Sequence, residues 1–193
     1  MEVFSQKEYF EKTFKSLNGA ELDISNVQFE KCTFDGCVFS KAKFYNCVFT
    51  DCVFQACDLA GLSFAGSRLN GVQFSESKLM GISWLDANTM LFSVGFRECQ
   101  LDYSNFFGMK LKQLNMINCC ANEVSFQEAD LTAADFSGTN LSRSVFLSTN
   151  LQKADFSGAS NYAFDPQANK VKGARFSVPS VLALLEPFAI DIV

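Results

Sequence analysis

Eight cysteines are the residues of this 193-residue sequence that could most readily do chemistry. A thiolate can attack a substrate, bind a metal ion or form a disulfide. The sequence has no histidine, which excludes Ser-His-Asp and Cys-His catalysis and any imidazole metal ligand. It also lacks a GxGxxG or P-loop phosphate-binding motif and a zinc-type CxxC pair. These features predict a protein that is not an enzyme and has no cofactor or metal site.

The cysteines follow a five-residue period of apolar side chains. A large apolar residue, here called a centre, falls on every fifth position from Phe29 to Trp84 and, after an interruption, from Leu91 to Phe156, with Ala121 as a small exception. Seven cysteines lie two positions before a centre, a position here called the slot. Three pairs of them are twenty residues apart: Cys32/Cys52, Cys37/Cys57 and Cys99/Cys119. Small apolar residues at such a position are typical of buried packing, so we expect free thiols rather than disulfides or metal ligands.

The same period indicates which elements must position these side chains. Residues two apart share one face of an extended segment, and glycines two positions after many centres, such as Gly61 and Gly138, mark turns. Short extended sides joined by turns form a coil that encloses its own apolar core. Centres twenty residues apart are alike, as in the series Leu111, Leu131, Leu151. Reading the chain at this period predicts coils stacked about 4.8 Å apart.

Three segments match the pattern A(D/N)LXX closely: Ala129-Asp130-Leu131, Ala134-Asp135-Phe136 and Ala154-Asp155-Phe156. In this the chain resembles the pentapeptide-repeat family. The resemblance implies an all-β fold, a right-handed quadrilateral β-helix with four pentapeptides per coil, to which the sequence adds a short C-terminal α-helix. We expect an N-terminal cap or irregular first coil over 1–26, the β-helix over 27–176 with a register slip at 85–90, and a helical dimerisation or capping segment over 177–193.

The last segment is too apolar to lie in water. Ser177 and Pro179 suit the start of a helix, Pro187 suits its end, and residues 188–193 alternate as a strand would. The segment either plugs the last coil or joins two rods in a homodimer. Its candidate dimerisation residues are Val181, Leu182, Leu184, Leu185, Phe188, Ile190 and Ile192.

Composition and charge limit the classes of partner. The net charge is −5, which disfavours direct nucleic-acid binding because phosphates require Lys and Arg. No apolar run approaches the roughly 18 residues of a membrane span, and the N-terminus has no apolar signal stretch. The sequence therefore predicts a cytoplasmic protein that binds neither nucleic acid nor membrane.

The length, the capping and the closing helix make the chain similar to the Qnr and MfpA quinolone-resistance proteins of that family. The resemblance implies a dimeric, DNA-mimicking rod that binds a type II topoisomerase, DNA gyrase or topoisomerase IV, and protects it from quinolones or similar poisons. Its acidic partner-binding surface would comprise Glu123, Glu128, Asp130, Asp135 and Asp155.

The alternative function is a structural or scaffold rod that binds an unrelated protein. Outward apolar residues offer a second partner surface, or else pack beneath the irregular segment; they are Met90, Phe92, Phe107, Ile117 and Leu147.

Overall fold

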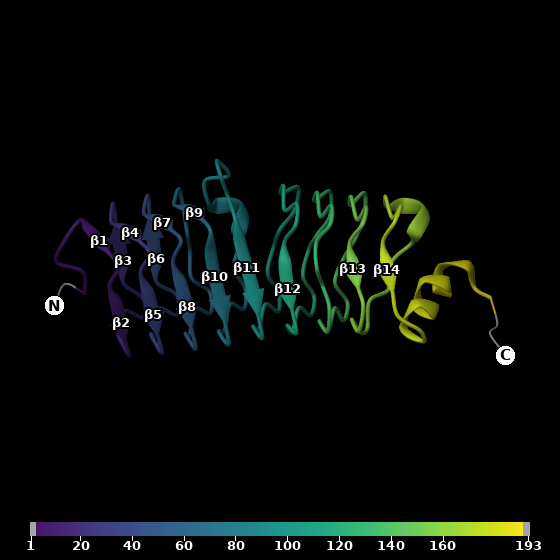
Figure 1. The fold of residues 1–193 in the computed structure, drawn as a ribbon, viewed down its shortest axis with the longest axis horizontal. Coiled ribbons are helices and arrows are strands. Elements are labelled where there is room, and N and C mark those ends of the chain that lie inside the picture. Colours follow the sequence, from purple (N-terminus) through teal and green to yellow (C-terminus); the bar gives the residue numbers. More distant parts are fainter. Residues whose placement is uncertain (1–2, 191–193) are drawn as a thin grey trace.

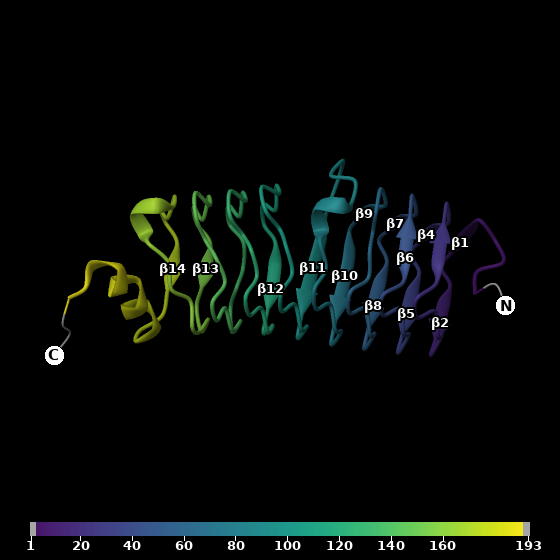
Figure 2. The same ribbon diagram turned by 180° about the vertical axis from the view of Figure 1, so that it is seen from behind.

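The computed structural model describes residues 3–190. The chain winds into a rod of stacked coils, with the N-terminus at one end and a helix near the C-terminus at the other (Figures 1 and 2). Neighbouring coils pair in parallel through residues twenty positions apart, as Val53 pairs with Gln73. Four such columns of pairs, five residues apart along the chain, give each coil four sides. The predicted four-sided β-helix is thus confirmed.

We number the four faces of the rod in chain order. The first face contains β1 (Glu8–Phe10), β4 (Gln28–Glu30), β7 (Val48–Thr50), β9 (Arg68–Asn70) and then the column Lys110, Asp130, Asn150, Lys170. The second face contains β2 (Thr13–Lys15), β5 (Thr33–Asp35), β8 (Val53–Gln55), β10 (Val72–Ser75), β11 (Val94–Arg97), β12 (Asn115–Ile117), β13 (Asp155–Phe156) and β14 (Arg175–Phe176). The third face has isolated bridges, from Asn18 with Val38 to Asn140 with Ser160. The fourth face contains β3 (Asp23–Ser25), β6 (Lys43–Tyr45) and then the column Ser83, Asn105, Ser125, Val145.

Centres of successive coils stack ring on ring inside the rod. The rings of Phe34 and Phe54 lie 4.4 Å apart between centroids at an interplanar angle of 8°. Neighbouring faces of one coil meet edge to face, as Phe29 and Phe34 do at 72°. Offset stacks and edge contacts are the arrangements that the ring quadrupole favours. The twenty-residue pairing therefore sets both the register of the strands and the packing of the core.

At most corners the backbone adopts a left-handed conformation two residues after a centre. Gly138 has φ 68° there, and a Cβ at this position would collide with Oδ1 of Asn118 on the preceding coil. Asn118 itself has φ 53°, a conformation that short polar residues adopt at little cost. This confirms that the regularly placed glycines mark the turns.

The interruption of the period forms a loop that projects from the rod between β9 and β11 (Figure 1). Arg68 pairs with Asn88, twenty residues later, whereas Val72 pairs with Val94, twenty-two residues later. The two additional residues therefore lie between Asn88 and Val94. This segment overlaps the slip expected at 85–90 but begins later, because the coil stays in register through the 3₁₀ helix η1 (Trp84–Asp86).

Leu91 is not a centre, contrary to the five-residue pattern. It is 75% exposed and has φ 58°. Phe92 packs against the core instead, with its ring 6.1 Å from that of Trp84 at 74°. The loop backbone does not pair with a neighbouring coil. The five-residue period therefore no longer predicts which side chain of the loop faces the core.

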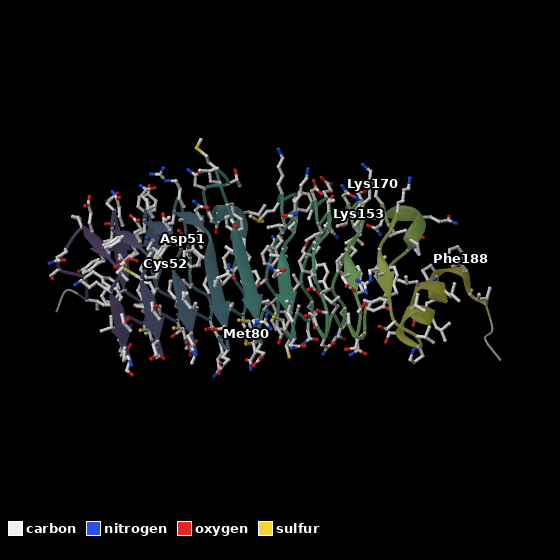
Figure 3. The ribbon with its side chains drawn as sticks, viewed as in Figure 1. Asp51, Cys52, Met80, Lys153, Lys170 and Phe188 are labelled. Atoms are coloured by element: carbon white, nitrogen blue, oxygen red, sulfur yellow. The ribbon has the colours of Figure 1, made fainter. Side chains whose placement is uncertain are left out.

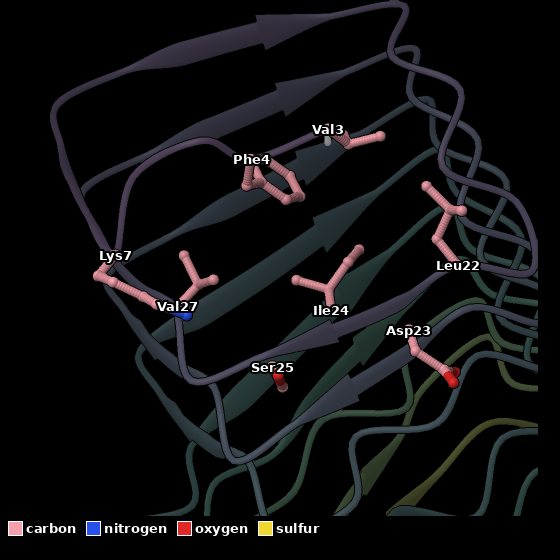
Figure 4. A pocket seen from close by; sticks show the side chains of 8 residues that line it. All are labelled: Val3, Phe4, Lys7, Leu22, Asp23, Ile24, Ser25 and Val27. Carbon is pink, nitrogen blue, oxygen red and sulfur yellow. The ribbon is translucent and has the colours of Figure 1, made fainter. Parts of the chain in front are cut away.

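The N-terminal region forms a regular first coil rather than an irregular one. The strands β1, β2 and β3 each pair in register with the next coil. Phe4, preceding this coil, is buried to 6% exposure and its ring contacts those of Tyr9, Phe14 and Phe29. The side chain of Phe4 therefore covers the open end of the core (Figure 4).

Near the other end, the repeat motif lapses over residues 161–169 but the core continues. Tyr162 and Phe164 are buried, and the 3₁₀ helix η2 (Pro166–Ala168) forms part of this side. Asn169 then restores the hydrogen bonding of the coil. Its side chain accepts from the Thr149 amide at 2.9 Å and donates to the Phe146 carbonyl at 3.0 Å.

The C-terminal helix η3 (Ser180–Phe188) has 3₁₀ rather than α geometry, and Pro187 lies within it instead of ending it. The chain leaves the helix at Ala189, which has φ 49°. Ser177 does not cap the helix, because its hydroxyl accepts a hydrogen bond from the Gly158 amide at 2.9 Å. Since Phe188 is helical, the strand expected over 188–193 does not begin there.

The remainder of that expected strand, including Ile192, lies beyond the described residues. Over residues 3–190, no helix combines the length and hydropathy required to cross a membrane.

Candidate functional site

The seven slot cysteines are buried, as the sequence predicts, and Cys120, which lies outside the slot, is exposed. Each buried thiol lies within hydrogen-bonding distance of backbone carbonyls; Sγ of Cys52 donates to the Phe29 carbonyl at 3.3 Å. Burial raises the pKa of the Cys52 thiol to about 12. The side-chain hydrogen bond between Cys57 and Cys37, together with burial, raises the pKa of Cys57. The same hydrogen bond lowers the pKa of Cys37 to about 7. Reactive cysteines are partly exposed, whereas all seven slot thiols are buried, so we interpret them as packing residues.

No metal centre emerges from these groups. Within residues 3–190, no set of three or more His, Cys, Asp or Glu side chains is placed to hold a metal ion.

The five acidic residues proposed from the sequence do not converge on one surface. Asp130 lies on the first face, Glu123 on the third and Glu128 on the fourth. Asp135 and Asp155 are neighbours on the second face, where their backbones pair. These two carboxylates are the pair from this set that the fold brings together.

Three of the five carboxylates form ion pairs with an adjacent coil. Asp130 lies 3.5 Å from Lys112, Glu123 lies 3.5 Å from Arg143, and Asp155 lies 3.1 Å from Arg175. Exposed pairs of this kind contribute little stability. They do neutralise charge, and Glu128 and Asp135 remain as the two members of the set for which no ion pair is found in the described part of the chain.

The aspartates of the repeat motif also have a structural role. Oδ1 of Asp135 and Oδ1 of Asp155 each accept a hydrogen bond from the amide two residues later, both at 2.8 Å. The hydrogen bond from Ser157 lowers the pKa of Asp155, and Arg175 adds to this effect. Although desolvation opposes it, hydrogen bonds from Thr132 lower the pKa of Asp130. All three aspartates thus accept a hydrogen bond that builds the corner following each of them.

Two charged surfaces become visible when outward residues are read at the twenty-residue period. The fourth face carries Asp86, Glu128 and Asp165. Its basic residue, Lys43, lies farther toward the N-terminal end of the rod. The first face carries five lysines in its C-terminal half: Lys110, Lys112, Lys153, Lys170 and Lys172. The five-residue period of the sequence does not reveal these two charged surfaces, because it groups residues by their distance from a centre and not by the face on which they lie.

The candidate dimerisation residues divide between two sides of η3. Leu184 is buried, and Val181 packs against the core at the end of the last coil. Leu185 is half-buried. The exposed side comprises Leu182 (41% exposed) and Phe188 (43%), and Ile190 (55%), which follows the helix, is exposed as well. One side of the helix thus plugs the rod while the other remains open to solvent.

Comparison with solved structures shows the same fold in proteins of distant sequence. A trypsin-treated variant of QnrB1, a plasmid-mediated fluoroquinolone resistance protein, is 20% identical with a TM-score of 0.58, and the match covers 96% of this chain and 97% of that one. HetL, a pentapeptide repeat protein involved in heterocyst differentiation regulation from the cyanobacterium Nostoc sp. strain PCC 7120, is 16% identical with a TM-score of 0.60, covering 88% and 85%. A search of curated proteins found no match.

Family comparison agrees with the fold. Residues 27–106 match the family described as "Pentapeptide repeat region", and residues 125–160 match "Pentapeptide repeats (8 copies)". Together these ranges cover more than half of the chain, and they lie within the part of the chain whose coils pair with one another. The chain belongs to the pentapeptide-repeat family.

Proposed function

We propose that this protein is a non-enzymatic rod that binds a type II topoisomerase, DNA gyrase or topoisomerase IV, at the surface that otherwise holds DNA. By competing for that surface in the cytoplasm, it lessens the action of quinolones or similar poisons. The observation that carries the proposal is the likeness to the fluoroquinolone resistance protein QnrB1 along almost the whole length of both chains. Competition of this kind requires shape and charge, and no covalent chemistry.

The charge for such competition comes from carboxylates that are not neutralised within the rod. Glu128 and Asp135 are the members of the acidic set without an ion pair among the described residues, and Asp86 and Asp165 extend the negative charge of the fourth face. A negative surface attracts the basic groove that holds DNA, and the attraction weakens as salt screens it.

The exposed side of η3 suits a homodimer through the C-terminus. Leu182, Phe188 and Ile190 would be covered by their counterparts in a twofold arrangement. A dimer joined end to end would be about twice as long as one rod, which would extend the surface that competes with DNA.

The test is DNA supercoiling by gyrase, and drug-induced DNA cleavage, titrated with the purified protein. The double variant Glu128→Gln/Asp135→Asn removes two charges, while the side-chain amide oxygen introduced at position 135 can still accept the corner hydrogen bond from the backbone amide of Ser137. We expect this variant to require about tenfold more protein for the same effect. Asp58→Asn, at an equivalent corner on the third face, is the matched control and should behave as the unaltered protein.

The second candidate is a scaffold rod for an unrelated protein. The observation that favours it is the neutralisation of Asp130, Glu123 and Asp155 by neighbouring basic residues. If micromolar folded protein leaves active gyrase and its drug-induced cleavage unchanged, the topoisomerase proposal is wrong and the scaffold function stands.

A further inference from the structure

The corner between the fourth and first faces carries a row of exposed apolar side chains, which Gln127 interrupts on the coil between Phe107 and Leu147. Leu85, Phe107 and Leu147 each follow a centre of the fourth face and are 40%, 40% and 50% exposed. Between the first two and the projecting loop lies a cavity of about 260 Å³ lined by Leu85, Phe92, Phe107 and the stem of Lys110, among others. Exposed apolar groups that line up beside a cavity are typical of a protein-binding surface.

Lysines form a second row across the same corner, on the first face. Lys110 and Lys170 occupy one column of paired residues, and Lys112, Lys153 and Lys172 lie beside it. All five are exposed, and within residues 3–190 only Lys112 forms an ion pair, with Asp130. Figure 3 shows Lys153 and Lys170 toward the edge of the rod from which the loop projects. Unpaired lysines at this density create a local positive potential on a protein whose net charge is −5.

We propose that this corner binds an extended, acidic segment of a partner protein in which apolar and carboxylate side chains alternate. Successive side chains of an extended segment point to opposite sides. Running along the corner, the segment would direct its apolar side chains toward Leu85, Phe107 and Leu147 and its carboxylates toward the lysines. Four coil spacings of about 4.8 Å separate Leu85 from Lys170, a length that about six extended residues span.

Nucleic acid suits this corner less well than an acidic peptide. Phosphates would match the lysines, but they would leave the apolar row exposed. The apolar row and the lysine row together therefore favour a peptide. Two of the acidic residues proposed to meet topoisomerase, Asp86 and Glu128, lie at this corner and border the surface.

Fluorescence anisotropy of a labelled peptide of alternating Glu and Leu tests this proposal. We expect saturable binding that weakens about tenfold in the Lys170→Glu/Lys172→Glu variant and similarly in Phe107→Ser. Two matched controls should bind within about twofold of the unaltered protein. Lys78→Glu changes a lysine at the same repeat position on the third face, and Tyr45→Ser changes an exposed aromatic at the repeat position of Phe107, three coils away.

Two modified peptides test whether both the carboxylates and the apolar side chains of the peptide contribute to binding. A peptide with Gln in place of Glu and a peptide with Ser in place of Leu should each bind more weakly than the parent peptide. Equal binding by a single-stranded oligonucleotide of the same charge would overturn the proposal, as would an absence of saturable binding. So would lysine and Phe107 variants that bind like their controls, provided thermal melts show them folded. If the lysine variant loses peptide binding but still inhibits gyrase, the two surfaces are independent and the corner proposal holds alone.

Discussion

At the scale of single residues, a polar side chain in the slot can hydrogen-bond to backbone groups at a corner of the preceding coil. It does so where the amide and the carbonyl at that corner do not bond to each other. Oγ of Ser144 accepts from the Val124 amide at 3.0 Å and donates to the Ala121 carbonyl at 2.5 Å. Where the corner closes on itself, as from the Ala134 amide to the Leu131 carbonyl at 3.0 Å, no side chain is required. This difference explains why the slot alternates between Ser, Thr or Cys and purely apolar residues.

The variant Ser144→Ala should destabilise the rod by about 2 kcal/mol, because it leaves a buried amide and a buried carbonyl without partners. Urea unfolding followed by circular dichroism measures this change. Ser142→Ala changes the serine two residues earlier, whose hydroxyl lies outside the core. It should alter stability by less than about 0.5 kcal/mol. Equal losses of stability in the two variants would contradict the proposed bridging role of Ser144.

The buried thiols predict a loss of stability at alkaline pH. The pKa of Cys52 is raised from 9.0 to about 12 in the folded state, so the folded protein holds this proton more tightly than the unfolded chain. The stabilisation is therefore complete below pH 9 and falls as the pH rises toward about 12. Thermal melts across this range should show a smaller decline for Cys52→Ser, which fits the slot as Ser67 does but does not titrate. Identical declines would contradict the assignment.

At the scale of elements, the projecting loop is a local insertion that the rod tolerates. Pairing is regular on both sides of it, and Phe92 fills the core position that Leu91 leaves empty. Because each coil is held by its two neighbours, a change within one coil does not propagate along the rod.

Removing Met90 and Leu91 together with the change Thr89→Leu should restore continuous five-residue spacing. We expect the shortened protein to fold with a thermal midpoint close to that of the parent, since two exposed apolar side chains are lost and Leu at position 89 takes over the core position of Phe92. Circular dichroism melting is the measurement. A protein that no longer folds would show that the loop is required for coil stacking. The matched control deletes the same two residues but leaves Thr89 unchanged, and should be the less stable variant.

At the scale of the whole molecule, the two ends of the rod are closed differently. Phe4 covers the N-terminal end from within the chain. At the other end η3 covers the core with Leu184 but presents Leu182, Phe188 and Ile190 to solvent. This asymmetry favours association through the C-terminal end rather than the N-terminal one.

The variant Phe188→Glu should therefore convert the proposed dimer into a monomer, because the charge would be buried in the twofold contact. Sedimentation equilibrium of both proteins gives the masses. Tyr103→Glu, an exposed aromatic position on the third face, should leave the mass of the dimer unchanged. An unaltered protein that remains monomeric at high concentration would show that η3 serves only as a plug.

The sequence by itself determined the coil, the centres from Phe29 onward and the burial of seven cysteines, because a repeat that contacts only its neighbours encodes its packing locally. It failed where that local phase is lost, at Leu91 and Pro187. Only the tertiary structure decided the surface: residues twenty positions apart become neighbours, so Arg175 neutralises Asp155 and Lys110 aligns with Lys170. Charges interact through space over about a Debye length. The order of residues along the chain does not give the distances between charged side chains on neighbouring coils.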